Sequence, residues 1–118
     1  MAAKDTLGRH GERLAAEYLE RRGYRVIGRN WRCRQGEIDL IALKPPETVF
    51  VEVKTRSSIA FGHPFEAITV AKLARLRRLA GAWCALSDEP VGRIRIDAIA
   101  VIVESGREPE IEHLQGVF

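Results

Sequence analysis

The feature that most restricts the fold of this chain is a pair of strand-like segments, GEIDLIAL and TVFVEVKTR, in which charges interrupt apolar side chains. Acidic residues and lysine are depleted in strands and cost free energy when they are buried. Two prolines in the intervening KPPE forbid a continuing ladder. The segments from Glu37 to Leu43 and from Thr48 to Thr55 therefore predict a β-hairpin whose charges need an explanation.

Alternation along the two strands assigns these charges to faces of the sheet. Successive strand residues point to opposite sides, so Glu37 and Asp39 share one face of the first strand, and Glu52 and Lys54 share one face of the second. All four charges can lie on the same side. The opposite face then carries Ile38, Leu40, Ala42, Val49, Val51 and Val53.

The register of the hairpin brings two carboxylates together. A four-residue loop from Lys44 to Glu47 pairs Asp39 with Glu52 and Glu37 with Lys54, and a two-residue loop gives the same register. Opposed Cβ atoms lie about 5 Å apart, and like charges so placed are destabilising. We therefore expect a cation in the gap, either Lys54 or a divalent metal such as Mg²⁺. The alternative is a solvated face with cross-strand salt bridges.

The rest of the chain alternates between helical and extended patterns. Apolar or small residues recur at helical spacing from Leu7 to Arg22, where Gly23 ends the helix, and from Leu73 to Leu86, with Thr69 as N-cap. The other predicted elements are a strand from Tyr24 to Asn30, the basic connection WRCRQG, a strand from Arg93 to Val103 and a short final strand in PEIEHL.

This order of elements predicts the fold class. Because a helix connects the second hairpin strand to the strand from Arg93 to Val103, those two strands should be parallel within a mixed sheet. We expect an α/β fold with helices flanking a central sheet, in the order α-β-β-β-α-β-β. A chain of 118 residues is expected to form one domain, residues 1–118.

Composition narrows the environment of the protein. The sequence has no run of about 20 apolar residues and no apolar N-terminal signal core, so we expect a cytoplasmic protein that does not enter a membrane. Cys33 and Cys84 belong to no CxxC or Cys/His cluster, which suggests neither a disulfide framework nor a zinc site. A net charge of +3 is compatible with a polyanionic partner without requiring one.

Several motifs occur together in a specific order: GEIDLIA, FVEVKTR, FGHPFEAI followed by Lys72, and RIRIDAIAV. This pattern, with HGERLAAEYLERRGYRVIGRN before it, resembles the YraN family of small bacterial proteins, which look like nucleases of the restriction-endonuclease fold. The resemblance implies that fold and a PD-(D/E)xK site formed by Asp39 and by Glu52-Val53-Lys54. Ile38 stands where the motif's name has proline. Similarity to archaeal Holliday-junction resolvases implies that Glu12, on the first helix, also belongs to the site.

The residue types at this implied site fit metal-assisted phosphodiester hydrolysis. Asp39 and Glu52 would bind Mg²⁺ or Mn²⁺, with the Val53 carbonyl as a further ligand, and the metal would lower the pKa of a bound water. Lys54 would orient that water or neutralise developing charge. For Glu12, an ordinary helix-surface role is the alternative. Glu37 could position a water, pair with Lys54 or form a simple salt bridge.

Other residues are candidates for nucleic-acid contacts or for support of the fold. Asp97 could pair with an arginine inside the protein or support the site. Trp31 could stack on a base or pack as part of a basic loop. The predicted nucleic-acid-binding residues are Arg32, Arg34, Thr55, Arg56 and Lys72.

These observations support three functional hypotheses. The first is a metal-dependent endonuclease acting on DNA, including branched or junction DNA. The second is a nucleic-acid-binding protein on a nuclease fold with a vestigial metal site, and the third is an interaction protein whose charged face is a salt-bridge network. Similarity to compact resolvases also suggests a homodimer.

Overall fold

The computed structural model describes residues 3–60, 62–88 and 90–118. Two earlier predictions include residues outside these ranges. The N-terminal segment used to predict the localisation includes Met1 and Ala2, and the motif FGHPFEAI includes Phe61. The elements are α1 (Ala3–Arg21), β1 (Arg25–Cys33), β2 (Gly36–Lys44), β3 (Glu47–Arg56), the 3₁₀ helix η1 (Pro64–Ala67), α2 (Val70–Leu86), β4 (Arg93–Ile102) and β5 (Glu110–Leu114).

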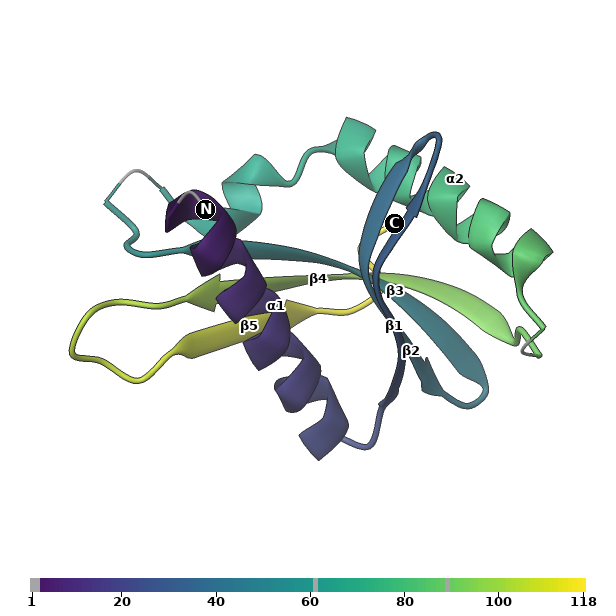
Figure 1. Cartoon of the computed structure of the whole chain (residues 1–118), viewed down its shortest axis with the longest axis horizontal. Coiled ribbons are helices and arrows are strands. Elements are labelled where there is room, and N and C mark those ends of the chain that lie inside the picture. Colours follow the sequence, from purple (N-terminus) through teal and green to yellow (C-terminus); the bar gives the residue numbers. More distant parts are fainter. Residues whose placement is uncertain (1–2, 61, 89) are drawn as a thin grey trace.

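The strands form one five-stranded sheet in the order β1-β2-β3-β4-β5 (Figure 1). Strands β3 and β4 are parallel, and every other neighbouring pair is antiparallel. This arrangement confirms the predicted α/β class with a mixed central sheet, and it is consistent with a restriction-endonuclease-like fold. Among the described residues, no helix combines the length and the apolar character needed to cross a membrane.

Each face of the sheet is covered by one helix. Ala15, Ala16 and Leu19 of α1 are fully buried against one face, because small side chains allow close helix packing. Leu76 and Leu79 of α2 pack on the other face. Helix α1 ends as predicted at Gly23, whose φ of 88° suits the left-handed cap position. Thr69 caps α2 by accepting a hydrogen bond from the Lys72 N–H, also as predicted.

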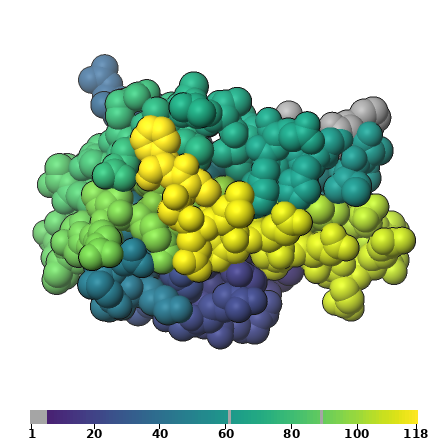
Figure 2. All heavy atoms as spheres, turned by 180° about the vertical axis from the view of Figure 1, so that it is seen from behind, coloured from purple at the N-terminus to yellow at the C-terminus, as the bar shows by residue number. Residues whose placement is uncertain are grey.

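The C-terminal segment after β5 closes the face that α2 covers. Seen from behind, this segment lies across the surface beside α2 (Figure 2). The Val117 N–H donates to the Ile96 carbonyl at 2.8 Å, and the Val117 side chain packs on the α2-side core. The C-terminus is therefore part of the packed fold.

The hairpin turn is shorter than the sequence predicted, and the expected four-residue loop is wrong. Lys44 pairs with Glu47, so Pro45 and Pro46 alone form the turn. At these two positions neither proline has to donate a ladder hydrogen bond. The register is the predicted one at this end, since Leu43 pairs with Thr48.

The basic connection predicted before the hairpin is also wrong. Strand β1 continues through Cys33, with Trp31 paired to Ile38. Trp31 and Cys33 pack on the α2-side core while Arg32 is exposed. This is the alternation of a strand, which was not recognised in the sequence because arginines precede and follow Cys33. The packing role of Trp31 is thereby confirmed within a strand.

Candidate functional site

The candidate site forms where β2 separates from β3. Ladder pairing between the two strands ends at Leu40 and Val51, so the predicted direct pairs of Asp39 with Glu52 and of Glu37 with Lys54 do not appear in the ladder. Instead, the Val53 N–H donates to Asp39 Oδ2 at 2.8 Å. The carboxylate thus replaces a ladder partner, which fixes its orientation at the fork between the strands.

The regular alternation of β2 also breaks at Asp39. Ile38 packs on the α2-side core, whereas Leu40 packs on the α1-side core and Ile41 returns to the α2 side. The predicted common face of Ile38 and Leu40 is therefore wrong. Asn30 of β1 lies between the residues paired with Ile38 and Leu40, and its φ of 51° marks an irregular strand at this point.

Helix α1 brings Glu12 to the fork because it approaches β3 very closely. A Cβ atom at Gly11 would overlap the Thr55 side chain, with Cγ2 only 2.6 Å away. Only glycine permits this approach without a shift of the helix. Glu12, the next residue, is consequently directed toward β2.

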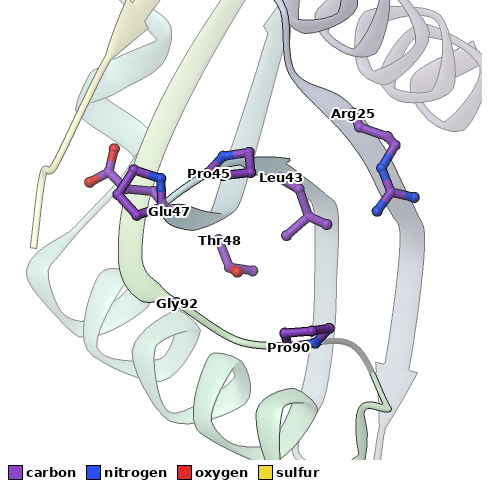
Figure 3. Close-up of a pocket in the computed structure, with 8 residues that line it drawn as sticks. Arg25, Leu43, Pro45, Glu47, Thr48, Pro90 and Gly92 are labelled. Atoms are coloured by element: carbon purple, nitrogen blue, oxygen red, sulfur yellow. The ribbon is translucent and has the colours of Figure 1, made fainter.

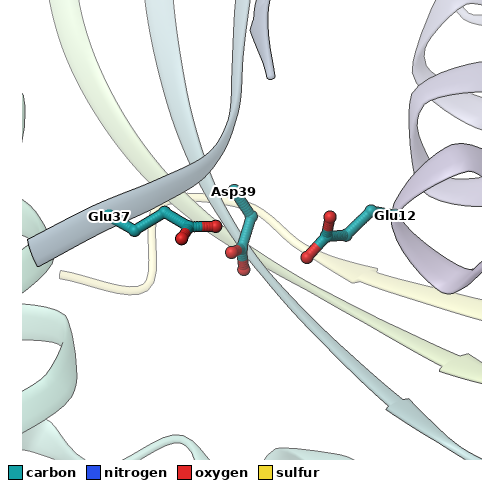
Figure 4. Close-up of side chains that lie close together, drawn as sticks. All are labelled: Glu12, Glu37 and Asp39. Carbon is teal, nitrogen blue, oxygen red and sulfur yellow. The ribbon is translucent and has the colours of Figure 1, made fainter. Parts of the chain in front are cut away.

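Three carboxylates converge at this point. Glu12, Glu37 and Asp39 each offer an oxygen atom, and these atoms lie within 4.8 Å of one another. Figure 4 shows Asp39 between Glu37 of the same strand and Glu12 of α1. Glu37 also accepts an ion-pair contact from Arg32 Nε at 2.8 Å. Arg32 and Glu37 are also partners in the register of β1 with β2, so this contact lies directly across the two strands.

Burial and neighbouring negative charge favour the protonated form of Asp39. Burial, followed by the charge of Glu52, raises the pKa of Asp39 from 3.8 to about 8, although the hydrogen bond from Val53 opposes the rise. Burial also raises the pKa of Glu12, against a hydrogen bond from the Asn30 side chain. Hard oxygen donors of this kind suit Mg²⁺ or Mn²⁺.

Glu52 lies beside positive charge as well as beside the cluster. Burial raises its pKa, while the charges of Lys72, Lys54 and Arg75 lower it. Glu52 is not among the three carboxylates whose oxygens converge within 4.8 Å. It lies close enough to Asp39 to raise that residue's pKa. The E-x-K segment therefore adjoins the carboxylate cluster and links it to the basic start of α2.

The five predicted nucleic-acid-binding residues lie on three segments around the site. Thr55 packs against Gly11, and Arg56 Nη1 donates to the Thr55 carbonyl at 3.1 Å. Lys72 Nζ donates to the Ala67 carbonyl at 2.9 Å and interacts electrostatically with Glu52. Arg32 pairs with Glu37, and Arg34 is exposed at the turn between β1 and β2.

Sequence reasoning missed Asn30. Its side chain hydrogen-bonds to the Glu12 carboxylate, and its positive φ occurs where asparagine is tolerated better than most residues. The available signal was an asparagine, a residue depleted in strands, followed immediately by a strand-like Trp31.

Asp97 belongs to a separate internal network. Its carboxylate accepts hydrogen bonds from Arg95 Nε at 2.9 Å and from the Gly116 N–H at 3.0 Å, and it contacts His113 Nε2 at 2.7 Å. Burial alone would raise the pKa of Asp97, but the bonds from His113, Arg95 and Gly116 outweigh it and lower the pKa. The arginine-pairing interpretation of Asp97 is confirmed, with His113 as an additional partner.

A hollow of about 370 Å³ lies at the other end of the hairpin (Figure 3). Leu43, which lines the hollow, is four positions from Asp39 on β2, a distance of about 13 Å along the strand. It is thus distinct from the carboxylate cluster. Its lining consists of Arg25, Leu43, Pro45, Pro46, Glu47, Thr48, Pro90 and Gly92.

Fold and site together define the class: an α/β protein consistent with restriction-endonuclease-like architecture, with a carboxylate cluster where two strands diverge. The family described as "Uncharacterised protein family UPF0102" matches residues 11–101. The chain therefore belongs to the UPF0102 family, which is the YraN family, and the resemblance found in the sequence is confirmed.

Individual relatives agree with this assignment. A UPF0102 protein of Arthrobacter sp. (strain FB24) is 56% identical over 117 residues, covering 99% of both chains. A relative from Leifsonia xyli subsp. xyli (strain CTCB07) shows the same identity and coverage. One from Nocardia farcinica (strain IFM 10152) is 50% identical over 115 residues, which cover 98% of this chain and 91% of the relative. The similarity extends across nearly the whole chain.

Proposed function

We propose that this protein is a metal-dependent nuclease that hydrolyses phosphodiester bonds of DNA, with branched or junction DNA as a candidate substrate. The observation that carries the proposal is the convergence of Glu12, Glu37 and Asp39 within 4.8 Å beside the Glu52-Val53-Lys54 segment. Carboxylates next to a lysine at a strand fork provide both a cation site and a positive group for a scissile phosphate.

Each residue has a role that follows from its environment. Asp39, held by the Val53 N–H, and Glu12, held by Asn30, would grip the metal, and Glu37 would complete the cluster. A bound Mg²⁺ or Mn²⁺ supplies a water of lowered pKa and stabilises charge on the phosphate.

Two residues of β3 complete the site. Glu52 lies beside the cluster among the positive charges of Lys72, Lys54 and Arg75. There it would orient the attacking water or serve as a further ligand of the cation. Lys54 would neutralise the negative charge that develops on the phosphate oxygens. The Val53 carbonyl remains a proposed ligand.

Cleavage assays with matched variants test this proposal. Purified protein is incubated with single-stranded, duplex, flap and four-way-junction DNA, and with RNA, in Mg²⁺, Mn²⁺ or EDTA. We expect metal-dependent cleavage that is lost in Asp39→Asn and in Glu52→Gln. It should persist in Asp88→Asn, which makes the same aspartate exchange at an exposed position after α2.

Other outcomes would separate the alternatives. Cleavage that survives both Asp39→Asn and Glu52→Gln would point to a contaminating nuclease and refute the site. Calorimetric binding of Mn²⁺ without cleavage of any substrate would favour the nucleic-acid-binding alternative with a vestigial metal site. Absence of both metal binding and cleavage would favour a salt-bridge network.

A further inference from the structure

We propose that a basic groove between α2 and the turn joining β1 to β2 binds the sugar-phosphate backbone of a substrate strand beyond the cleaved bond, so that the preferred substrate is an extended polynucleotide. This inference rests on the proposed function and adds the substrate class to it. The groove has a volume of about 400 Å³ and is called the α2 groove below. Its lining residues are Gln35, Arg75, Arg78, Leu79 and Ala82.

The charge on α2 is one-sided. The helix contains four basic residues and no acidic residue. With about 100° between successive helical residues, Lys72, Arg75 and Arg78 lie on one flank, while Arg77 points about 160° away from Arg75. The buried position Leu76 lies between these flanks, about 100° from Arg75 and about 100° from Arg77. Arg75 and Arg78 line the groove, Lys72 extends this positive stripe toward Glu52, and Arg77 does not belong to it.

The arginines of this groove are available to an anion. Arg75 and Arg78 are exposed, and neither forms an ion pair or a side-chain hydrogen bond within the part of the chain that the structure describes. A second basic hollow, beside α1 and β1, differs in this respect. There Arg13 contacts Glu17 at 3.8 Å and Arg29 contacts Glu20 at 3.9 Å. Of these two hollows, the one beside α2 is therefore the one whose arginines are not paired with neighbouring carboxylates within the described residues.

The groove is connected to the candidate site. Lys72 and Arg75 interact electrostatically with Glu52, and Arg75 also lines the groove. Lys72 and Arg78 are six positions apart, which corresponds to about 9 Å along the helix axis. Because each strand of duplex DNA carries one phosphate for about every 3.4 Å of the duplex axis, a stripe of this length can contact more than one phosphate. A strand whose scissile phosphate lies at the cluster would place its next phosphates against these arginines.

The groove also fits a backbone better than it fits a compact anion. Gln35 contributes an amide that can donate to a phosphate oxygen or accept from a sugar or base, and Leu79 and Ala82 supply an apolar wall. Phosphate contacts of this kind position a strand without reading its sequence. DNA and RNA share this chemistry, so both are tested.

Binding of labelled oligonucleotides in EDTA tests the groove independently of cleavage. Fluorescence anisotropy is measured for single strands of 4, 8 and 16 nucleotides, as DNA and as RNA, over a range of salt concentrations. Wild-type affinity should rise with length, and Arg75→Gln/Arg78→Gln should weaken binding of the longer strands at least tenfold. The slope of log affinity against log salt should fall by about 0.7 for each lost contact.

Arg77→Gln is the control, since it removes one arginine charge from the opposite flank of the same helix, and it is compared with Arg75→Gln and Arg78→Gln measured singly. It should leave the length dependence and the salt slope close to those of the wild type. Equal weakening by Arg77→Gln, or no effect of the double variant, would overturn the inference. Preference for DNA or for RNA identifies the source of the backbone.

The outcome is separable from that of the cleavage assay. Length-dependent binding that requires Arg75 and Arg78, in a protein that cleaves nothing, would refute the nuclease proposal and leave the groove as a backbone-binding site. Cleavage that depends on Asp39 and Glu52, but with binding insensitive to the double variant, would refute the groove alone.

Discussion

Replacing Asp39 by asparagine should make the metal-free protein more stable while removing its metal binding. Burial and the charge of Glu52 raise the pKa of Asp39 from 3.8 to about 8. Asparagine is neutral at every pH and keeps a side-chain oxygen that can accept the Val53 N–H bond, which is 2.8 Å long in the wild type. The variant therefore removes the repulsion and retains the contact.

The pH dependence of this gain follows from linkage. Because the pKa of Asp39 is higher in the folded state, the stability that its protonated form contributes is fully present below pH 3.8 and is lost as the pH rises to about 8. At pH 7 this loss amounts to about 4 kcal/mol, at 1.36 kcal/mol for each pH unit. Asparagine avoids it, so the advantage of the variant should be near zero at pH 4 and should grow toward pH 8.

Urea denaturation in EDTA at several pH values measures this advantage as a difference in the free energy of unfolding. Asp88→Asn, at an exposed position, serves as the control and should show no such growth with pH. Calorimetry with Mn²⁺ should detect binding to the wild type that strengthens as the pH rises toward 8, since the metal must displace a proton, and none to Asp39→Asn. A variant that is destabilised at all pH values, or stabilised equally at pH 4 and pH 8, would refute the reasoning.

Three further predictions concern the packing of α1, the internal network of Asp97 and the support of Glu12. Gly11→Ala should cost about 1–3 kcal/mol in urea denaturation, because the added methyl group overlaps β3; Gly81→Ala, which meets nothing within 4 Å, should not be destabilising. Asp97→Asn should cost about 3–5 kcal/mol at pH 7 by removing a buried ionic partner. Because the pKa of Asp97 is lowered in the folded state, the stability that its carboxylate contributes is present above its ordinary pKa and is lost as the pH falls. The destabilisation by Asp97→Asn should therefore shrink below about pH 4, and an equal destabilisation at pH 3 would contradict this sign. Asn30→Gly keeps the positive φ accessible but removes the side-chain hydrogen bond to Glu12. It should change the free energy of unfolding by about 1 kcal/mol or less and should weaken Mn²⁺ binding in calorimetry. Unchanged metal affinity would exclude a role of Asn30 in positioning Glu12.

Much of the fold was predictable because it depends on local patterns. The helical spacing around Ala15 and Leu19, the terminating Gly23 and the capping Thr69 act within a few residues of chain, and all appear in the structure as expected. The parallel pairing of β3 with β4 followed from the helix that connects them. The length of β1 could not be predicted in this way, since Trp31 belongs to the strand through its pairing with Ile38 and its packing on the α2-side core, which are contacts with distant residues.

The amino-acid order is enough to show that charges interrupt an apolar hairpin, which residue types are available for a cation, and to which family the chain belongs. Which carboxylates meet depends on the packing of distant segments. Strict alternation opposed Asp39 to Glu52, but the fork between β2 and β3 directs Asp39 toward the Val53 N–H and toward Glu12. The physical reason is that Glu12 arrives on a separate helix, and its position depends on how closely α1 can approach Thr55 at Gly11. Such a contact between distant segments leaves no periodic pattern in the sequence.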